Sequence, residues 1–155
     1  MKTRLAALFL LASYTTLTSQ VVFEQQTIID SSYGAINPRA IATADLNNDG
    51  FEDLLLAGNG DVVWVPATDG TGTFDKALPL ISELVEANKI AAADFDGDND
   101  QDIVVFARAD NGSYEILYLE NMDALGTFAT PVSLANTDAL SRLNMQVLDV
   151  DDDDD

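Results

Sequence analysis

The sequence contains no cysteine and no histidine. Without them the chain cannot form a disulfide, a cysteine nucleophile or a serine–histidine–aspartate triad, and it lacks the ligands that zinc and copper prefer. Basic residues are also scarce, since 7 Lys and Arg stand against 27 Asp and Glu, for a formal net charge of −20. This balance argues against nucleic acid or an anionic membrane as a partner, and it makes a cation the natural counterpart.

Apolar residues, by contrast, are plentiful. They make up 47% of the chain, against 22% charged residues, which is too high for a disordered acidic tail and typical of a folded protein. The length of 155 residues corresponds to one small domain.

Residues 1–20 have the layout of a secretory signal peptide. Lys2 and Arg4 precede an apolar run at 5–12, and a more polar stretch then leads to a cleavage position near Gln20. A membrane anchor is the alternative, but the apolar run is less than half of the ~20 residues needed to span a bilayer. We therefore expect an exported protein, secreted or at the cell surface, with no transmembrane segment after cleavage.

The remaining chain, 21–155, repeats itself with a period of about fifty residues. The segment IATADLNNDGFEDLLLAG at 41–58 matches IAAADFDGDNDQDIVVFA at 90–107, which places Asp45 and Asp94 in register 49 residues apart. A fixed period of this length is typical of repeat architectures.

The similarity extends beyond these two segments. Gly72-Thr73-Phe74 is repeated as Gly126-Thr127-Phe128, and Trp64 and Tyr118 each precede the phenylalanine of their copy by ten residues. A third copy begins at MQVLDVDDDDD, where Asp149 takes the place of Asp45 and Asp94. We therefore expect two complete repeats and the start of a third.

The local pattern is that of short β-strands. Asn59-Gly60 and Asn111-Gly112 are strong hairpin signals, and they lie between runs rich in branched and aromatic residues. These runs are 54–57, 62–65, 103–107 and 114–119. Residues 81–90 have apolar residues at helical spacing, but ten residues are marginal for a helix, and we expect a loop or a single turn there.

Each repeat thus supplies about four antiparallel strands, the last of which starts at the Gly-x-Phe element. Four strands per unit of 40 to 50 residues predict an all-β fold built from the blades of a partial β-propeller. A β-sandwich also consists of short strands, but it gives no reason for the period.

The acidic loops at 45–53 and 94–102 have the spacing of a calcium site. Positions 1, 3, 5 and 9 carry a side-chain oxygen in both loops, whereas position 7 is Phe51 in one and Asp100 in the other, which suggests a backbone carbonyl ligand there. The predicted metal ligands are Asp45, Asn47, Asp49, Phe51 and Asp53 in the first loop, and Asp94, Asp96, Asp98, Asp100 and Asp102 in the second.

Other interpretations of these loops fit less well. Asp, Asn and Gly also form ordinary turns, but a turn needs one or two such residues rather than a duplicated alternating set. An EF-hand requires a glutamate at position 12, where this chain has Leu56 or Val105, and Mg²⁺ prefers to keep several waters. At 149–155 the chain lacks position 9, so a solvated acidic end is as reasonable there as a site.

The aspartate-rich loops and the Gly-x-Phe elements resemble the FG-GAP and VCBS-type repeats of integrin-α-like β-propellers. Asn47 replaces an aspartate of the family pattern in the first loop, and Asn99 stands where glycine is usual in the second. The resemblance covers 21–155. It implies a calcium-stabilised propeller in an exported protein, and it implies that this chain is a fragment of a longer one because a closed propeller needs four to eight blades.

The expected function is that of a non-enzymatic, secreted, calcium-binding repeat module with a structural, adhesive or partner-binding role toward a protein or glycan. One alternative is the scaffold portion of a secreted carbohydrate-active enzyme, in which Trp64 and Tyr118 would stack on sugars unless they belong to the core. Another is an acidic calcium buffer, which the apolar content disfavours.

Overall fold

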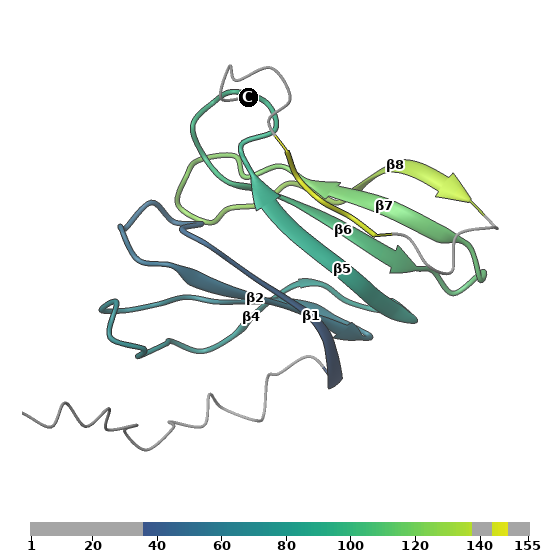
Figure 1. Ribbon diagram of the computed structural model, residues 1–155, viewed down its shortest axis with the longest axis horizontal. Helices are drawn as coiled ribbons and strands as arrows, with labels where there is room; N and C mark the ends of the chain where they lie inside the picture. Colours follow the sequence, from purple (N-terminus) through teal and green to yellow (C-terminus); the bar gives the residue numbers. More distant parts are fainter. Residues whose placement is uncertain (1–35, 138–143, 149–155) are drawn as a thin grey trace, which may run out of the picture.

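The computed structural model describes residues 36–137 and 144–148, which form two four-stranded antiparallel sheets and contain no helix. The two sheets lie face to face (Figure 1). This arrangement confirms the prediction of an all-β fold made of propeller-like blades. The expected leader at 1–20 and the third acidic stretch at 149–155 lie outside the described residues.

Each sheet corresponds to one sequence repeat, and we call the two sheets blade 1 and blade 2. Blade 1 consists, in spatial order, of β1 (Ile36–Ala44), β2 (Asp53–Asn59), β3 (Val62–Val65) and β4 (Leu78–Ile81). Blade 2 consists, in the same order, of β5 (Glu86–Ala93), β6 (Asp102–Arg108), β7 (Tyr114–Leu119) and β8 (Val132–Thr137).

Both predicted Asn-Gly hairpins are present. They join β2 to β3 and β6 to β7, with Gly60 and Gly112 at φ values of +96° and +88°. Glycine adopts this left-handed conformation without steric cost, which explains why the strand runs reverse at these positions.

The prediction for 81–90 was wrong over its second half. Residues 82–85 do form a loop, but Ile81 ends β4 and the segment from Glu86 onward belongs to β5. Pairing with β6 gives this segment a ladder of backbone hydrogen bonds and buries Ala87 and Ile90 in the core. The stability that these long-range contacts provide outweighs the weak local preference for a helix.

The fourth strand of each blade also starts later than expected. Phe74 and Phe128 form only isolated bridges, with Ala67 and Asn121 respectively. Two backbone hydrogen bonds make up each bridge, and the regular ladder resumes only at the first residues of β4 and β8. The Gly-x-Phe element therefore closes a loop before the strand rather than beginning the strand.

The hydrophobic core lies between the blades, where β5 packs against β1 and β2. Leu55 and Trp64 of blade 1 meet Ile103, Val105 and Leu117 of blade 2, and all five side chains are buried. A fully buried side chain of this kind contributes about 1.5–3 kcal/mol. Trp64 is a core residue and presents no face for a sugar. None of the described residues forms a helix that could cross a membrane.

Candidate metal centre

The second acidic loop joins β5 to β6 and is organised around Asp94. Its carboxylate accepts hydrogen bonds from the backbone N–H groups of Gly97 (2.8 Å), Asp98 (3.2 Å) and Asn99 (2.8 Å). Gly97 and Asn99 have φ values of +80° and +74°, which Gly and Asn tolerate better than other residues. The alternating sequence thus curls around one side chain.

This curl brings three of the predicted ligands together. Asp94, Asp96 and Asp102 each place a carboxylate oxygen within 4.8 Å of the others. Partial desolvation, together with the charges of Asp102 and Asp98, raises the pKa of Asp96. Three hard oxygens held this closely repel one another unless a cation lies between them, so the arrangement fits a metal such as Ca²⁺.

The backbone counteracts part of this repulsion at Asp94. Desolvation disfavours its charged form, but the N–H donors of Asn99 and Gly97 outweigh that effect and lower the pKa of Asp94. The carboxylate is therefore held in the ionised form that a metal ligand requires.

Asp98 and Asp100 lie outside the three-carboxylate cluster. Asp98 accepts a hydrogen bond from the backbone N–H of Asp100 (3.1 Å), and Asp100 accepts one from the N–H of Ala124 (3.0 Å). The side chain of Asp100, at position 7 of the acidic loop, is thus hydrogen-bonded to the loop that follows β7. The assignment of its backbone carbonyl as a ligand stays a prediction.

Asp102 has a second role besides its place in the cluster. It is fully buried at the start of β6, where Oδ1 accepts from the N–H of Asn121 (2.8 Å) and Oδ2 from the hydroxyl of Tyr118 (2.8 Å) and the N–H of Phe95 (3.3 Å). Burial and the adjacent Asp102 raise the pKa of Tyr118, which keeps the phenol protonated as a donor. Sequence reasoning missed Asn121 and this role of Tyr118.

The first acidic loop, between β1 and β2, has the same pattern of backbone hydrogen bonds but carries fewer acidic side chains. Asp45 accepts from the N–H groups of Asp49 (3.0 Å) and Gly50 (2.8 Å), as Asp94 does in the second loop. The amide of Asn47 donates to Asp49 (2.9 Å). Because Asn47 replaces the acid equivalent to Asp96, the described residues of this loop form no cluster of three carboxylates.

The other two predicted ligands of the first loop are anchored in blade 1. Asp53 is fully buried and accepts from the N–H groups of Ala67 (2.7 Å) and Leu46 (3.1 Å), and desolvation by burial raises its pKa. The ring of Phe51 lies against Gly70, where an added Cβ would come within 2.7 Å of it. Phe51 can therefore offer only its backbone to a metal.

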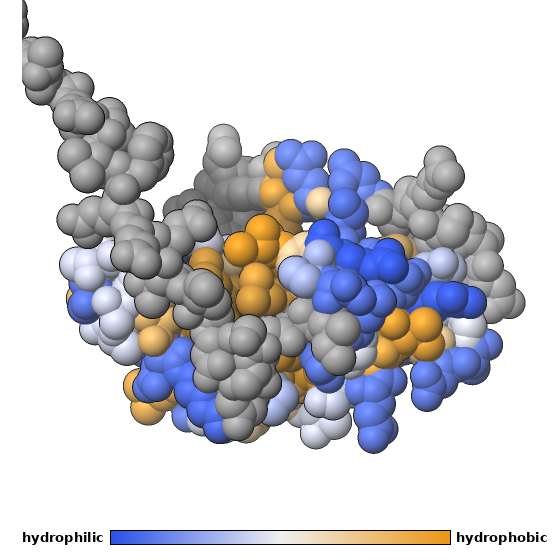
Figure 2. Space-filling view, turned by 90° about the horizontal axis from the view of Figure 1, so that it is seen from below, coloured by the Kyte–Doolittle hydropathy of each residue, from blue (hydrophilic) through white to orange (hydrophobic). Residues whose placement is uncertain are grey.

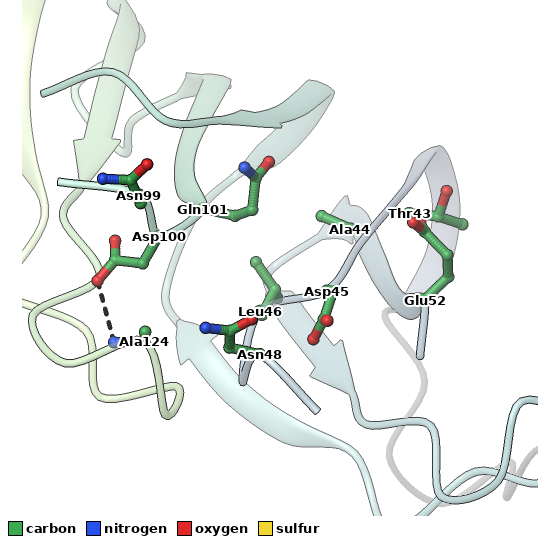
Figure 3. A pocket seen from close by; sticks show the side chains of 10 residues that line it. All are labelled: Thr43, Ala44, Asp45, Leu46, Asn48, Glu52, Asn99, Asp100, Gln101 and Ala124. Atoms are coloured by element: carbon green, nitrogen blue, oxygen red, sulfur yellow. Dashed lines mark hydrogen bonds between the residues drawn. The ribbon is translucent and has the colours of Figure 1, made fainter. Parts of the chain in front are cut away.

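A cavity of about 360 Å³ separates the two acidic loops (Figure 3). Its lining residues are Thr43, Ala44, Asp45, Leu46, Asn48 and Glu52 of blade 1, and Asn99, Asp100, Gln101 and Ala124 of blade 2. Near it the blades are linked directly, because the amide of Asn121 donates to the carbonyl oxygen of Leu46 (2.9 Å). The first acidic loop is thus held by blade 2 as well as by its own strands.

Residues 45–105 match the family model of an FG-GAP-like repeat. The match begins at Asp45, the first residue of the first acidic loop, and ends at Val105 in β6, beyond the second loop. The chain contains an FG-GAP-like repeat. The FG-GAP-like match thus includes every predicted metal ligand, and it confirms the resemblance inferred from the aspartate spacing. No curated protein and no solved structure matches the chain.

Proposed function

We propose that this chain is an exported, calcium-binding, β-propeller-type repeat module that serves a structural or partner-binding role and performs no catalysis. The observation that carries the proposal is the convergence of Asp94, Asp96 and Asp102 within 4.8 Å in a loop of an FG-GAP-like repeat. Export rests on the signal-peptide layout of residues 1–20.

Calcium suits this site better than the other common ions. The donors are carboxylate oxygens, and the sequence offers no cysteine or histidine for zinc or copper. Ca²⁺ accepts six to eight oxygens in flexible geometry, which a loop rich in Asp can supply, whereas Mg²⁺ demands a stricter octahedron and retains water.

The ion would act by stabilising the blade. Asp102 connects the cluster to Asn121 and Tyr118, so an ion at the cluster would fix the start of β6 and the loop that follows β7. Extracellular calcium modules have dissociation constants of about 10⁻⁴ to 10⁻³ M. At ten times the dissociation constant, one site adds about 1.4 kcal/mol to the free energy of unfolding.

The partner would be a protein or a glycan that contacts the exposed loops. With its formal charge of −20, the chain does not favour a polyanion. The scaffold of a carbohydrate-active enzyme is less well supported, because Trp64 is only 5% exposed and Tyr118 bonds to Asp102 instead of presenting a free edge.

The variant Asp96→Asn tests the calcium site. Asp96 is exposed, and its only described hydrogen bond is a weak one from the N–H of Asp98 (3.3 Å), so the substitution removes a charge from the cluster with little effect on the fold. We expect calorimetric titration to show calcium binding to the wild-type chain and at least about tenfold weaker binding to the variant, a loss of about 1.4 kcal/mol.

The matched control is Asp110→Asn, the same change at an exposed residue of the β6–β7 hairpin. It should bind calcium as the wild-type chain does. Equal calcium affinity in Asp96→Asn and the wild-type chain, or an identical melting temperature of the wild-type chain with calcium and with chelator, would show that the second loop is not the proposed site.

A further inference from the structure

The side chain of Asn121 contacts both acidic loops. Its amide group donates to the carbonyl oxygen of Leu46 in the first loop (2.9 Å) and to that of Gln101 in the second (3.3 Å). The amide oxygen accepts no hydrogen bond from the described residues, so the two donated bonds alone fix the orientation of the amide. One side chain therefore serves both loops at once.

The contacts of Asn121 continue to the aspartate at position 9 of each loop. In blade 2 its backbone N–H donates to Asp102 (2.8 Å), a member of the three-carboxylate cluster. In blade 1 the N–H of Leu46 donates to Asp53 (3.1 Å), which is the equivalent of Asp102. A path of hydrogen bonds thus runs from the candidate metal centre to the first acidic loop, and its members in order are Asp102, Asn121, Leu46 and Asp53.

The residues of this path are shielded from water. Each of the four is 0% exposed. Hydrophilic residues border the face seen in Figure 2, where water can replace a lost hydrogen bond, whereas a fully buried carbonyl or carboxylate that loses its donor is left unsatisfied. A displacement at one end of the path therefore costs free energy along it.

Blade 1 shows which part of this arrangement both blades share. Ala67 takes the place of Asn121, because each forms the isolated bridge with the phenylalanine of its Gly-x-Phe element and each donates its N–H to the aspartate at position 9. The N–H bond is thus common to both blades, but the link to another loop requires the amide. Asn121→Ala removes that link and installs the residue that blade 1 already has at this place.

We propose that a cation bound at the three-carboxylate cluster of blade 2 also orders the first acidic loop, with Asn121 as the positioning residue that transmits the effect. The ion holds Asp102 in place against the repulsion of its neighbours, and Asp102 in turn fixes Asn121 and Leu46. This inference rests on the proposed calcium site and adds a role to it, since the ion of one blade stabilises the loop of the other.

The first loop has the greater need for such support. Because Asn47 replaces the acid equivalent to Asp96, this loop has fewer carboxylates for an ion of its own. Its described residues form no cluster of three carboxylates. Coupling between two sites is reciprocal, so a well-ordered first loop also raises the affinity of the cluster for its cation.

Hydrogen exchange of single amides, followed by nuclear magnetic resonance, tests the proposal on the full chain. The reporters are the N–H groups of Asp49 and Gly50 in the first loop and those of Gly97 and Asn99 in the second, all of which donate to the aspartate at position 1. Calcium at ten times its dissociation constant should slow exchange by up to about tenfold in the second loop and by at least about twofold in the first. Slower exchange in the second loop alone would overturn the proposal.

Two variants separate transmission through Asn121 from other causes. In Asn121→Ala, calcium should still slow exchange in the second loop and should leave the first loop unchanged. In Asp96→Asn, the same calcium concentration should slow the second loop by no more than about twofold and the first loop not at all. Wild-type slowing of the first loop in either variant would overturn the proposal, because the effect would then come from packing or from an ion bound to the first loop itself.

The matched control is Asn88→Ala, which removes a different amide from the contact between the blades. Asn88 accepts a hydrogen bond from Arg39 of β1 (3.2 Å), and it makes no described hydrogen bond to either acidic loop. This variant should respond to calcium as the wild-type chain does. The comparison of the wild-type chain with Asp96→Asn needs no change at Asn121, so it decides the proposal even when Asn121→Ala does not fold.

Calorimetric titration of the wild-type chain separates failure of this inference from failure of the proposed function. A chain that binds no calcium would overturn both. A chain that binds calcium in the second loop, with exchange in the first loop unchanged, would overturn only the coupling through Asn121.

Discussion

The side-chain amide of Asn121 donates a 2.9 Å hydrogen bond to the carbonyl oxygen of Leu46, which belongs to the acidic loop of the other blade. Its backbone N–H donates to Asp102 (2.8 Å). One fully buried residue therefore joins the candidate metal loop of blade 2 to the acidic loop of blade 1. Neither loop can shift without disturbing the contact between the blades.

Replacing Asn121 with Ala should destabilise the chain by about 1–3 kcal/mol, because the buried carbonyl of Leu46 would lose its partner. Chemical denaturation monitored by tryptophan fluorescence can measure this change, since Trp64 lies at the same interface. Asn136→Ala is the control, because Asn136 is exposed in β8 and its amide makes only long hydrogen bonds, to Ser113 (3.4 Å) and Glu115 (3.3 Å). It should change the free energy of unfolding by about 0.5 kcal/mol. Equal effects of the two substitutions would contradict the bridging role.

Gly126→Ala should be more destabilising than Gly72→Ala. Both glycines have positive φ values, +86° and +90°, so both substitutions incur the backbone cost of about 1–2 kcal/mol. An added Cβ at Gly126 would clash with the indole ring of Trp64, whereas one at Gly72 would meet nothing within 4 Å. Displacing Trp64 should therefore destabilise Gly126→Ala by about a further 1–3 kcal/mol. Thermal melting measures the difference, and equal melting temperatures would contradict a close packing contact between Trp64 and Gly126.

Removal of the Tyr118 hydroxyl should weaken blade 2. In Tyr118→Phe, Asp102 keeps its bonds to Phe95 and Asn121 but loses the 2.8 Å bond to the phenol. Hydrogen bonds to charged groups contribute about 1.5–3 kcal/mol. Tyr114→Phe is the control, since no hydrogen bond of its hydroxyl is described, and it should unfold at nearly the same denaturant concentration as the wild-type chain.

Asp100 makes stability depend on pH in calcium-free buffer. Desolvation by burial is the main cause that raises the pKa of Asp100 to about 6, and the neighbouring Asp98 adds to it. The folded chain therefore holds a proton on Asp100 at pH values where the unfolded chain has released it. The contribution of Asp100 to the free energy of unfolding is fully present below about pH 4, and it is lost as the pH rises through about 6.

Asp100→Asn isolates this contribution. The variant should lose less stability than the wild-type chain between pH 4 and pH 6.5, as measured by denaturation in the presence of chelator. Parallel stability curves for the two proteins over this range would mean that Asp100 titrates normally in the folded chain.

Much of the fold followed from local sequence signals. The Asn-Gly pairs at 59–60 and 111–112 predicted both hairpins, because only residues that tolerate positive φ reverse a strand so tightly. The 49-residue offset between Asp45 and Asp94 predicted two equivalent units, and the family match at 45–105 agrees with it. The strand at Glu86 was missed because its stabilising partners in β6 are distant in sequence.

The alternating aspartates by themselves determined that the loops would curl and carry concentrated charge, since spacing fixes which side chains and N–H groups lie within reach of each other. Only the tertiary structure decided which carboxylates meet: Asp94, Asp96 and Asp102 converge, whereas Asp100 turns to Ala124 and Asp53 braces Leu46 and Ala67. The reason is physical. The partners of a buried carboxylate come from strands and loops that the chain brings alongside only when it folds, and those contacts leave no local pattern in the sequence.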